Sequence, residues 1–223
     1  MKQTTPTAAA ASKAAYHHGD LRRSLLDAAL GLVASHGVQG FTLREAARAA
    51  QVSHNAPYRH FSSRTHLLIE LAIEGQGHLR AALQAAVAKS ADHRERLVRL
   101  GVAYMEFAIA QAAHFRVMFS SEVALHRTPE LKAAQDTTFD FFESVLLASE
   151  RAGLIRQGVQ QHALVGWSAL HGAALLVLDG VLQETAVAAR RKPREIARLV
   201  IDSLLTGILN SKEQSSAHRE HRG

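Results

Sequence analysis

Apolar residues recur at three- and four-residue spacing along most of this chain, which is the period of an amphipathic α-helix. The first run follows Asp20, whose side chain can cap a helix, and it ends at Gly37. Later runs begin at capping residues such as Ser62, Asp92 and Thr128. We therefore expect an all-α protein, with helices over about 20–36, 42–50, 53–60, 62–83, 92–111, 114–119, 128–153, 157–178 and 193–208.

The stretch from Phe41 to Phe61 predicts two short helices joined by a tight turn. Thr42 and Glu45 form a capping box, in which each side chain can bond the backbone N–H of the other residue, and Ser53 is a second N-cap candidate. Each helix has roughly two turns and is too short to persist alone in water, so it must pack against the apolar face of the first helix. This arrangement is typical of a helix-turn-helix, whose second helix is presented to the major groove of DNA.

Polar side chains of this stretch are candidates for contact with DNA. Arginine can bond guanine through two N–H groups, asparagine can bond adenine, and tyrosine or histidine can donate to phosphate oxygens. Phe61 is expected in the core instead, and core packing is an alternative for Tyr58. The side chains expected to face a partner are Arg44, Arg48, His54, Asn55, Tyr58, Arg59 and His60.

The positive charge of the chain is concentrated near its start. Of the net charge of +6, residues 1–66 carry +5, from eight Lys and Arg against three Asp and Glu, whereas residues 67–210 carry fifteen of each sign. A local positive field suits the binding of phosphate groups, although a purely solvating surface is the alternative.

The segment from Gln157 to Leu178 contains no Asp, Glu, Lys or Arg. A membrane span is not expected, because polar residues shorten its apolar part below the roughly 20 residues that a bilayer needs. A helix buried on two sides, by its own domain and by a second copy of the protein, explains it better. The helix that opens near Pro193 has an apolar face that could join the same homodimer interface.

Other classes of function receive little support from the sequence. The chain has no cysteine, its 14 histidines are scattered, and no glycine-rich nucleotide loop or catalytic arrangement stands out. No cofactor, metal site or catalytic residue is therefore predicted. A small all-helical enzyme or ligand-binding protein without DNA binding remains the alternative.

The segment GDLRRSLLDAALGLVASHGVQGFTLREAARAAQVSHNAPYRHFSSRTHLL, residues 19–68, resembles the N-terminal DNA-binding region of the TetR family of bacterial transcriptional regulators. The resemblance implies that the helix after Ser53 enters the major groove and that Arg64, at the start of the next helix, faces a backbone phosphate. Asn55 and Pro57 depart from the family pattern, and since proline lacks an N–H the start of this helix is expected to be irregular. The implied DNA-binding residues are Thr42, Arg44, Ser53, His54, Asn55, Tyr58, Arg59, His60 and Arg64.

The motif WSALHG, from Trp167 to Gly172, resembles the Trp-His-Gly signature of one C-terminal subgroup of this family. It implies an effector pocket, for which the candidates are Tyr104, His114, Phe142, Trp167 and His171; the alternative is that Trp167 and His171 are core residues. The expected organisation is a disordered arm over 1–18, a DNA-binding domain over 19–66, an effector-binding and dimerisation domain over 67–210 and a disordered tail over 211–223. The function implied is that of a cytoplasmic, homodimeric repressor that binds a palindromic operator in double-stranded DNA and is released by a small-molecule effector.

Overall fold

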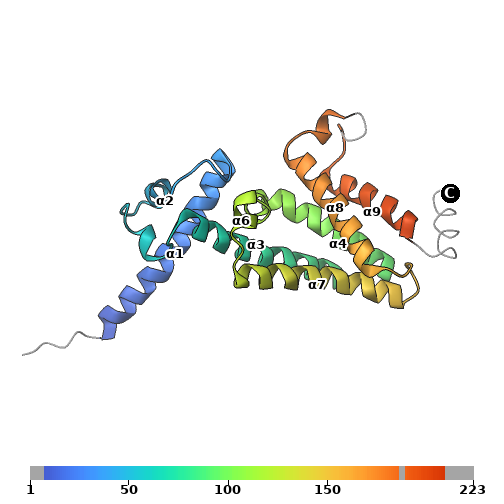
Figure 1. Ribbon diagram of the computed structural model, residues 1–223, viewed down its shortest axis with the longest axis horizontal. Helices are drawn as coiled ribbons and strands as arrows, with labels where there is room; N and C mark the ends of the chain where they lie inside the picture. The colour runs from blue at the N-terminus through green and yellow to red at the C-terminus, as the bar shows by residue number, and fades with distance from the viewer. Residues whose placement is uncertain (1–7, 186–188, 209–223) are drawn as a thin grey trace, which may run out of the picture.

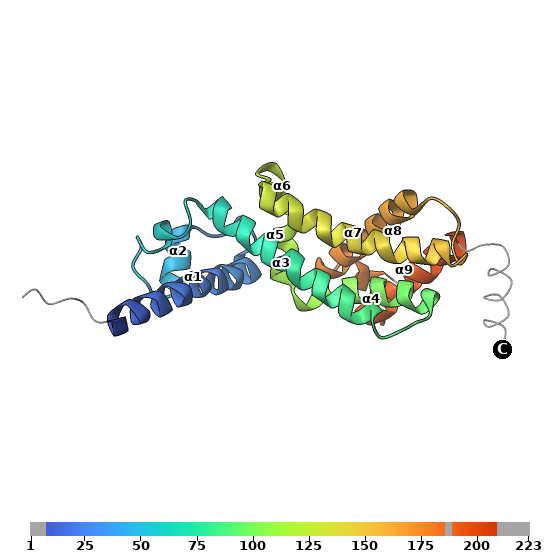
Figure 2. The same cartoon turned by 90° about the horizontal axis from the view of Figure 1, so that it is seen from below.

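The structure is a computed structural model that describes residues 8–185 and 189–208. The described residues form helices and connecting turns, without a β-strand, as the apolar spacing predicted. α1 and α2 lie at one end of an elongated molecule, and α8 and α9 lie toward the other end, with α3 and α7 running along the bundle between them (Figures 1 and 2). The elements are α1 Ala8–His36, α2 Leu43–Ala49, the 3₁₀ turn η1 Pro57–Arg59, α3 Arg64–Val87, α4 His93–Ala110, α5 Ala112–Met118, α6 Ser121–Leu125, α7 Pro129–Arg151, α8 Val159–Leu178, the 3₁₀ turn η2 Leu182–Glu184 and α9 Pro193–Ile208.

The first helix is longer than predicted. α1 begins at Ala8, so the predicted start at Asp20 is wrong, and the arm expected to be disordered over 1–18 is helical from residue 8. The alanine-rich composition of this part of the chain has a high helix propensity, which accounts for the extension. Residues 1–7 and the predicted tail 211–223 lie outside the described residues. The end of the helix is as predicted, because Gly37 adopts a φ of 79°, which glycine tolerates best.

The second helix forms as predicted. The Thr42 hydroxyl accepts a hydrogen bond from the Glu45 N–H at 3.2 Å, and the Glu45 carboxylate accepts one from the Thr42 N–H at 2.8 Å. The helix ends at Ala49 with Ala50 as its C-cap, and the following Gln51 takes a positive φ of 57° while the N–H of Val52 bonds the Ala47 carbonyl. This pattern is a Schellman motif, in which a left-handed residue turns the chain out of the helix.

The α-helix predicted over about 53–60 is not present. The chain makes a turn in which the Ala56 N–H bonds the Ser53 carbonyl, followed by the 3₁₀ turn η1, and no side chain caps η1. Pro57 has no N–H with which to continue an α-helical pattern from Ser53, and its ring is buried. The irregularity expected from Pro57 therefore extends over the whole segment.

The N-terminal helices share a core with the start of α3. Leu25 and Phe61 are fully buried, and Phe41 and Leu43 are nearly so, which confirms that Phe61 packs inward. Ser63 then caps α3 by accepting a hydrogen bond from the His66 N–H. Because α3 is one continuous helix of 24 residues, it joins the N-terminal unit of α1, α2 and η1 to the bundle without a break.

The bundle is built from helices with predictable starts. Asp92 caps α4, and Thr128 caps α7 with Pro129 at its first position. The five-residue helix α6 and the turn η2 were not predicted. Gly75 allows α3 and α5 to approach closely, since a Cβ at this position would lie 2.6 Å from the Met118 sulfur.

The segment without charged residues forms α8, which packs against α4, α7 and α9. By length and composition α8 could cross a membrane, and 22% of its most apolar 18-residue stretch is buried within the single chain. Several of its large apolar side chains are exposed, including Leu164 and Leu176. The chain itself therefore covers one side of α8 and leaves large apolar side chains of the helix exposed.

Candidate nucleic-acid interface and effector cavity

The turn from Ser53 to His60 presents a row of polar side chains to solvent. Ser53, His54 and Asn55 are exposed before η1, and Arg59 is exposed within it. Tyr58 is 52% exposed, which contradicts the alternative that it packs in the core. α2 adds Arg44 on the outer face of the same unit, and the Thr42 side chain, although exposed, is engaged in the capping box. This surface can offer guanidinium, imidazole, amide and phenol groups to a polyanion.

His60 lies at the inner edge of this surface. Its side chain is half-buried and its ring lies 6.3 Å, centre to centre, from the ring of Phe61. It is therefore less accessible than Tyr58 or Arg59, and it joins the exposed turn to the core below.

Arg64 does not have the geometry that the resemblance implied. Its Nη1 donates to the Val38 carbonyl at 2.6 Å, and its guanidinium forms an ion pair with Glu122 of α6. These partners compete with a phosphate group for the guanidinium, and the phosphate contact of Arg64 stays a prediction. Glu122 was missed by sequence reasoning, since a pair separated by 58 residues leaves no local pattern.

Ion pairs also determine which positive charges are left for a partner. Arg22 pairs with Glu70, and Arg23 pairs with Asp27 and with Glu74, so these arginines join α1 to α3. The remaining arginines of the described N-terminal unit are Arg44, Arg48 and Arg59, and no ion pair within the described residues involves them. Their charge is therefore available to phosphate groups, and it lies on α2 and η1.

A cavity of about 370 Å³ lies in the bundle and is lined by three of the predicted pocket residues. Tyr104 from α4, Phe142 from α7 and Trp167 from α8 line it. Its wall is mainly apolar, with a smaller polar part contributed by side chains such as Gln76, Gln135 and Arg127. This size and this mixture suit a small, largely apolar ligand with a few polar groups.

His171 supports this cavity from behind. It does not line the cavity, but its Nδ1 lies 2.9 Å from the Tyr104 hydroxyl, and its ring lies 4.4 Å from the ring of Phe119 and 5.5 Å from that of Trp167. Burial lowers the pKa of His171 and raises the pKa of Tyr104, which favours the neutral form of both. His171 thus resembles the hydrogen-bonded interior histidine that was the alternative reading of the motif.

His114 lies elsewhere, between α5 and α3. Its Nε2 is 3.0 Å from Glu74 Oε1, and it lines neither this cavity nor a second one described below. Burial lowers the pKa of His114, although Glu74 opposes that shift. Glu74 and its neighbour His78 were not singled out from the sequence, although their i, i+4 spacing could have indicated a pair on one helix face.

A second cavity, of about 460 Å³, lies between α4, α7, α8 and α9. Its lining is almost wholly apolar and includes the exposed residues Leu164 and Val165 of α8. Phe142 contributes to both cavities.

Comparison with known proteins matches the N-terminal and the C-terminal part of the chain to models of the same family of regulators. Residues 25–71 match the family model described as bacterial regulatory proteins of the tetR family, and residues 97–204 match that of the tetracyclin repressor-like C-terminal domain. The chain is 31% identical over 104 residues to a probable acrEF/envCD operon repressor of Escherichia coli (strain K12), an alignment of 44% of this chain and 46% of that protein. The chain thus spans about half the length of this relative.

Two further relatives are matched over more of their length. An uncharacterized HTH-type transcriptional regulator of Mycobacterium bovis is 27% identical over 169 residues, which are 74% of this chain and 86% of that protein. A solved structure of a protein of unknown function from Rhodococcus sp. RHA1 has a TM-score of 0.75 at 33% identity, covering 87% of this chain and 98% of that one. The fold of this chain therefore recurs in a solved structure of similar sequence.

Proposed function

Because the chain belongs to the TetR family of bacterial regulatory proteins, we propose that it is a transcriptional repressor that binds a palindromic operator as a homodimer and releases it when a small molecule binds. The observation that carries this proposal is the exposed surface of Arg44, His54, Asn55, Tyr58 and Arg59 on the helix-turn-helix unit. Such a protein acts on DNA in the cytoplasm.

The exposed turn from Ser53 to His60 would enter the major groove. Arg59 and Arg44 have guanidinium groups without an ion-pair partner among the described residues, so they can meet phosphates or guanine edges. Tyr58 and His54 can donate to phosphate oxygens. Because η1 is a 3₁₀ turn, only its few exposed side chains, with those of the preceding turn, would approach the bases.

The homodimer would form through α8 and α9. Leu164, Val165 and Leu176 of α8 are 59%, 54% and 43% exposed, and Leu199 of α9 is 42% exposed, so the pair of helices presents an apolar face. A face of this kind is costly to leave in water, and a second copy of the same helices would cover it. Two DNA-binding units held in this way would meet successive major grooves about 34 Å apart.

The effector would bind in the cavity beside Tyr104, Phe142 and Trp167. The cavity wall also includes Ala124 of α6 and Arg127 just beyond it, and α6 carries Glu122, which pairs with Arg64 at the start of α3. A ligand that displaces α6 would therefore act on the base of the DNA-binding unit. Repression is relieved if the ligand prefers a conformation with lower affinity for the operator.

The alternative of a small helical enzyme or binding protein without DNA binding is not favoured. Both matched family models describe regulators, and the N-terminal match spans the helix-turn-helix itself. The assignment of the C-terminal domain to the Trp-His-Gly subgroup stays a prediction from the motif around Trp167.

Selection of bound sequences from random duplex DNA tests this function. The full chain is immobilised, bound duplexes are recovered and amplified over several rounds, and the enriched sequences are read. We expect an inverted repeat whose half-site centres are about one helical turn apart. Enrichment of no sequence, with binding that depends only on salt concentration, would contradict the proposal.

A further inference from the structure

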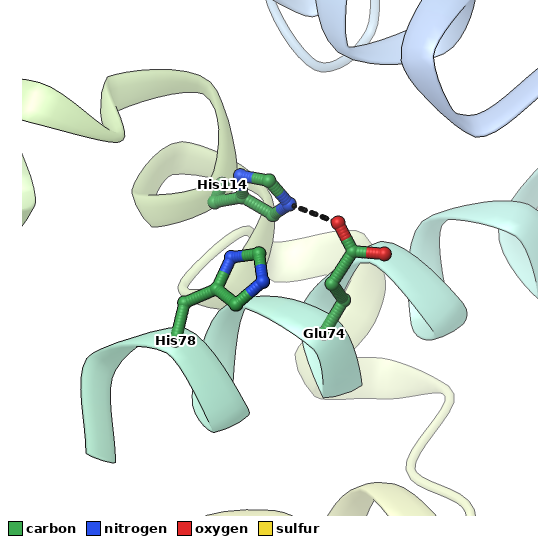
Figure 3. Close-up of side chains that lie close together, drawn as sticks. All are labelled: Glu74, His78 and His114. Carbon is green, nitrogen blue, oxygen red and sulfur yellow. Dashed lines mark hydrogen bonds and ion pairs between the residues drawn. The ribbon is translucent and has the colours of Figure 1, made fainter. Parts of the chain in front are cut away.

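Glu74, His78 and His114 bring three metal-binding groups together outside both cavities. Glu74 and His78 lie one turn apart on α3, and His114 faces them from α5 (Figure 3). One ligand atom from each residue can be chosen so that all three lie within 4.8 Å of one another. The proposed contacts with DNA and effector use none of these side chains.

The spacing suits a divalent transition metal. Nitrogen and carboxylate ligands lie about 2.0–2.2 Å from Zn²⁺, so two ligands of a tetrahedral site are separated by about 3.3 Å. His114 Nε2 and Glu74 Oε1 are 3.0 Å apart, close to that separation. The exposed His78 can adjust its ring by rotation about its side-chain bonds, and solvent can supply a fourth ligand.

Both of the more buried ligands have partners that orient them. His114 Nδ1 lies 3.2 Å from Gln111 Oε1, and the Arg23 guanidinium donates to Glu74 Oε2 at 2.6 Å. When Nδ1 carries the proton and donates it to Gln111 Oε1, the Nε2 lone pair can bind an ion. Supporting contacts of this kind accompany ligating histidines and carboxylates in metal sites.

An oxygen atom lies within hydrogen-bond distance of each ring nitrogen of His114. His114 has an oxygen acceptor at each ring nitrogen, Gln111 Oε1 on one side and Glu74 Oε1 on the other. A neutral imidazole carries one N–H, so it cannot donate to both. With the proton on Nδ1, a cation bound by Nε2 and Oε1 would satisfy both atoms at once.

We propose that Glu74, His78 and His114 form a binding site for a divalent transition-metal ion of the Zn²⁺ type. Two imidazoles and a carboxylate are a ligand set that such ions prefer, whereas Mg²⁺ and Ca²⁺ prefer oxygen ligands alone. The site has three protein ligands and one exposed edge, and the positive charge of Arg23 lies beside it, so it binds the ion more weakly than a closed four-ligand site. Because Arg23 belongs to α1, the ion would lie where the DNA-binding unit meets the bundle.

Equilibrium dialysis of the full chain against Zn²⁺ tests the site without any DNA. Other histidines of the chain can bind Zn²⁺ weakly, so the informative quantity is the difference between variants. We expect His78→Ala to weaken the tightest Zn²⁺ binding at least about tenfold, and Gln111→Ala, which alters only the orientation of His114, to weaken it by about tenfold. The matched control is His126→Ala, an exposed histidine at the end of α6, which should bind as the wild type does.

A second variant and a second measurement distinguish loss of the site from a folding defect. Glu74→Gln keeps a side chain that can bond His114 but removes the charge, and its circular dichroism is compared with that of the wild type before dialysis. Loss of the tight Zn²⁺ in this variant with an unchanged spectrum supports the site. Wild-type stoichiometry and affinity in both His78→Ala and Glu74→Gln would overturn it, whatever the outcome of the DNA selection.

Discussion

Arg64 and Glu122 form an ion pair that joins the first turn of α3 to α6, 58 residues further along the chain. The Thr65 hydroxyl donates to the other carboxylate oxygen of Glu122 at 2.7 Å. The Glu122 side chain is only 12% exposed and that of Arg64 only 21%, so water screens the pair little. The Glu122 carboxylate thus links the shortest α-helix of the described residues to the base of the DNA-binding unit.

Replacing Glu122 by glutamine should therefore destabilise the protein. We expect the free energy of unfolding to fall by about 2 kcal/mol, as is usual when a hydrogen-bonded charged group loses its partner. Urea denaturation followed by circular dichroism measures this loss. Asp136→Asn is the control, because Asp136 pairs with Lys132 on an exposed face of α7 and should lose less than about 1 kcal/mol. Equal losses in the two variants would contradict the role given to Glu122.

The close contact of α3 with α5 at Gly75 gives a second prediction. A methyl group there would meet Met118, whereas one at Gly77 would meet nothing within 4 Å. Both substitutions by alanine gain about 1 kcal/mol of helix propensity, but Gly75→Ala adds a steric cost of about 1–3 kcal/mol. In denaturation experiments Gly75→Ala should be the less stable of the two by that cost. Equal stabilities would show that α3 and α5 are not packed as described.

The proposed dimer interface predicts an effect on mass. Leu176→Glu introduces a charge on the exposed apolar face of α8, which should prevent a second copy from covering it. Light scattering at micromolar concentration should give twice the chain mass of 24.2 kDa for the wild type and the chain mass itself for the variant. Leu125→Glu is the control, since Leu125 is 81% exposed on α6 and should leave the dimer intact. A monomeric wild type would exclude the interface.

His171 should make the stability of the protein depend on pH. Burial lowers its pKa in the folded state, so the unfolded chain takes up a proton more readily. Above the unfolded pKa of about 6.5 both states are neutral and nothing is lost; as the pH falls below that value, the free energy of unfolding decreases until the folded pKa is passed. His114, whose pKa burial also lowers, contributes in the same direction.

Urea denaturation between pH 7.5 and pH 5 measures this dependence. His171→Phe cannot bind a proton and should show a shallower decrease in stability with falling pH than the wild type. An identical pH dependence in the two proteins would mean that His171 is protonated in the folded state as easily as in the unfolded one.

The sequence predicted helices well where a local pattern determines them. Thr42 with Glu45 and Thr128 with Pro129 place caps and first-turn residues within four positions, and both helices begin there. The prediction of an α-helix after Ser53 was wrong because it followed the family pattern. Pro57 lacks the N–H that an α-helix needs at this position, and the segment forms a 3₁₀ turn instead.

Contacts between distant residues were beyond the reach of the sequence. The family pattern predicts a phosphate contact for Arg64, and only the fold shows that Glu122 is also its partner. Of the predicted pocket residues, Tyr104 and Trp167 do line one cavity. His114 lies outside that cavity and contacts Glu74 of α3 instead. Residue type restricts the chemistry, and packing decides which groups meet.

The salt dependence of operator affinity tests the central claim most directly. The operator obtained by selection is titrated at several salt concentrations with the wild type, with a Tyr58→Ala, Arg59→Ala double variant, and with Arg151→Ala, which removes an exposed charge at the end of α7. The account predicts that the double variant binds at least about tenfold more weakly, with a slope of log affinity against log salt reduced by about 1, while Arg151→Ala behaves as the wild type. Wild-type affinity and salt slope in the double variant would contradict the assignment of this surface to DNA.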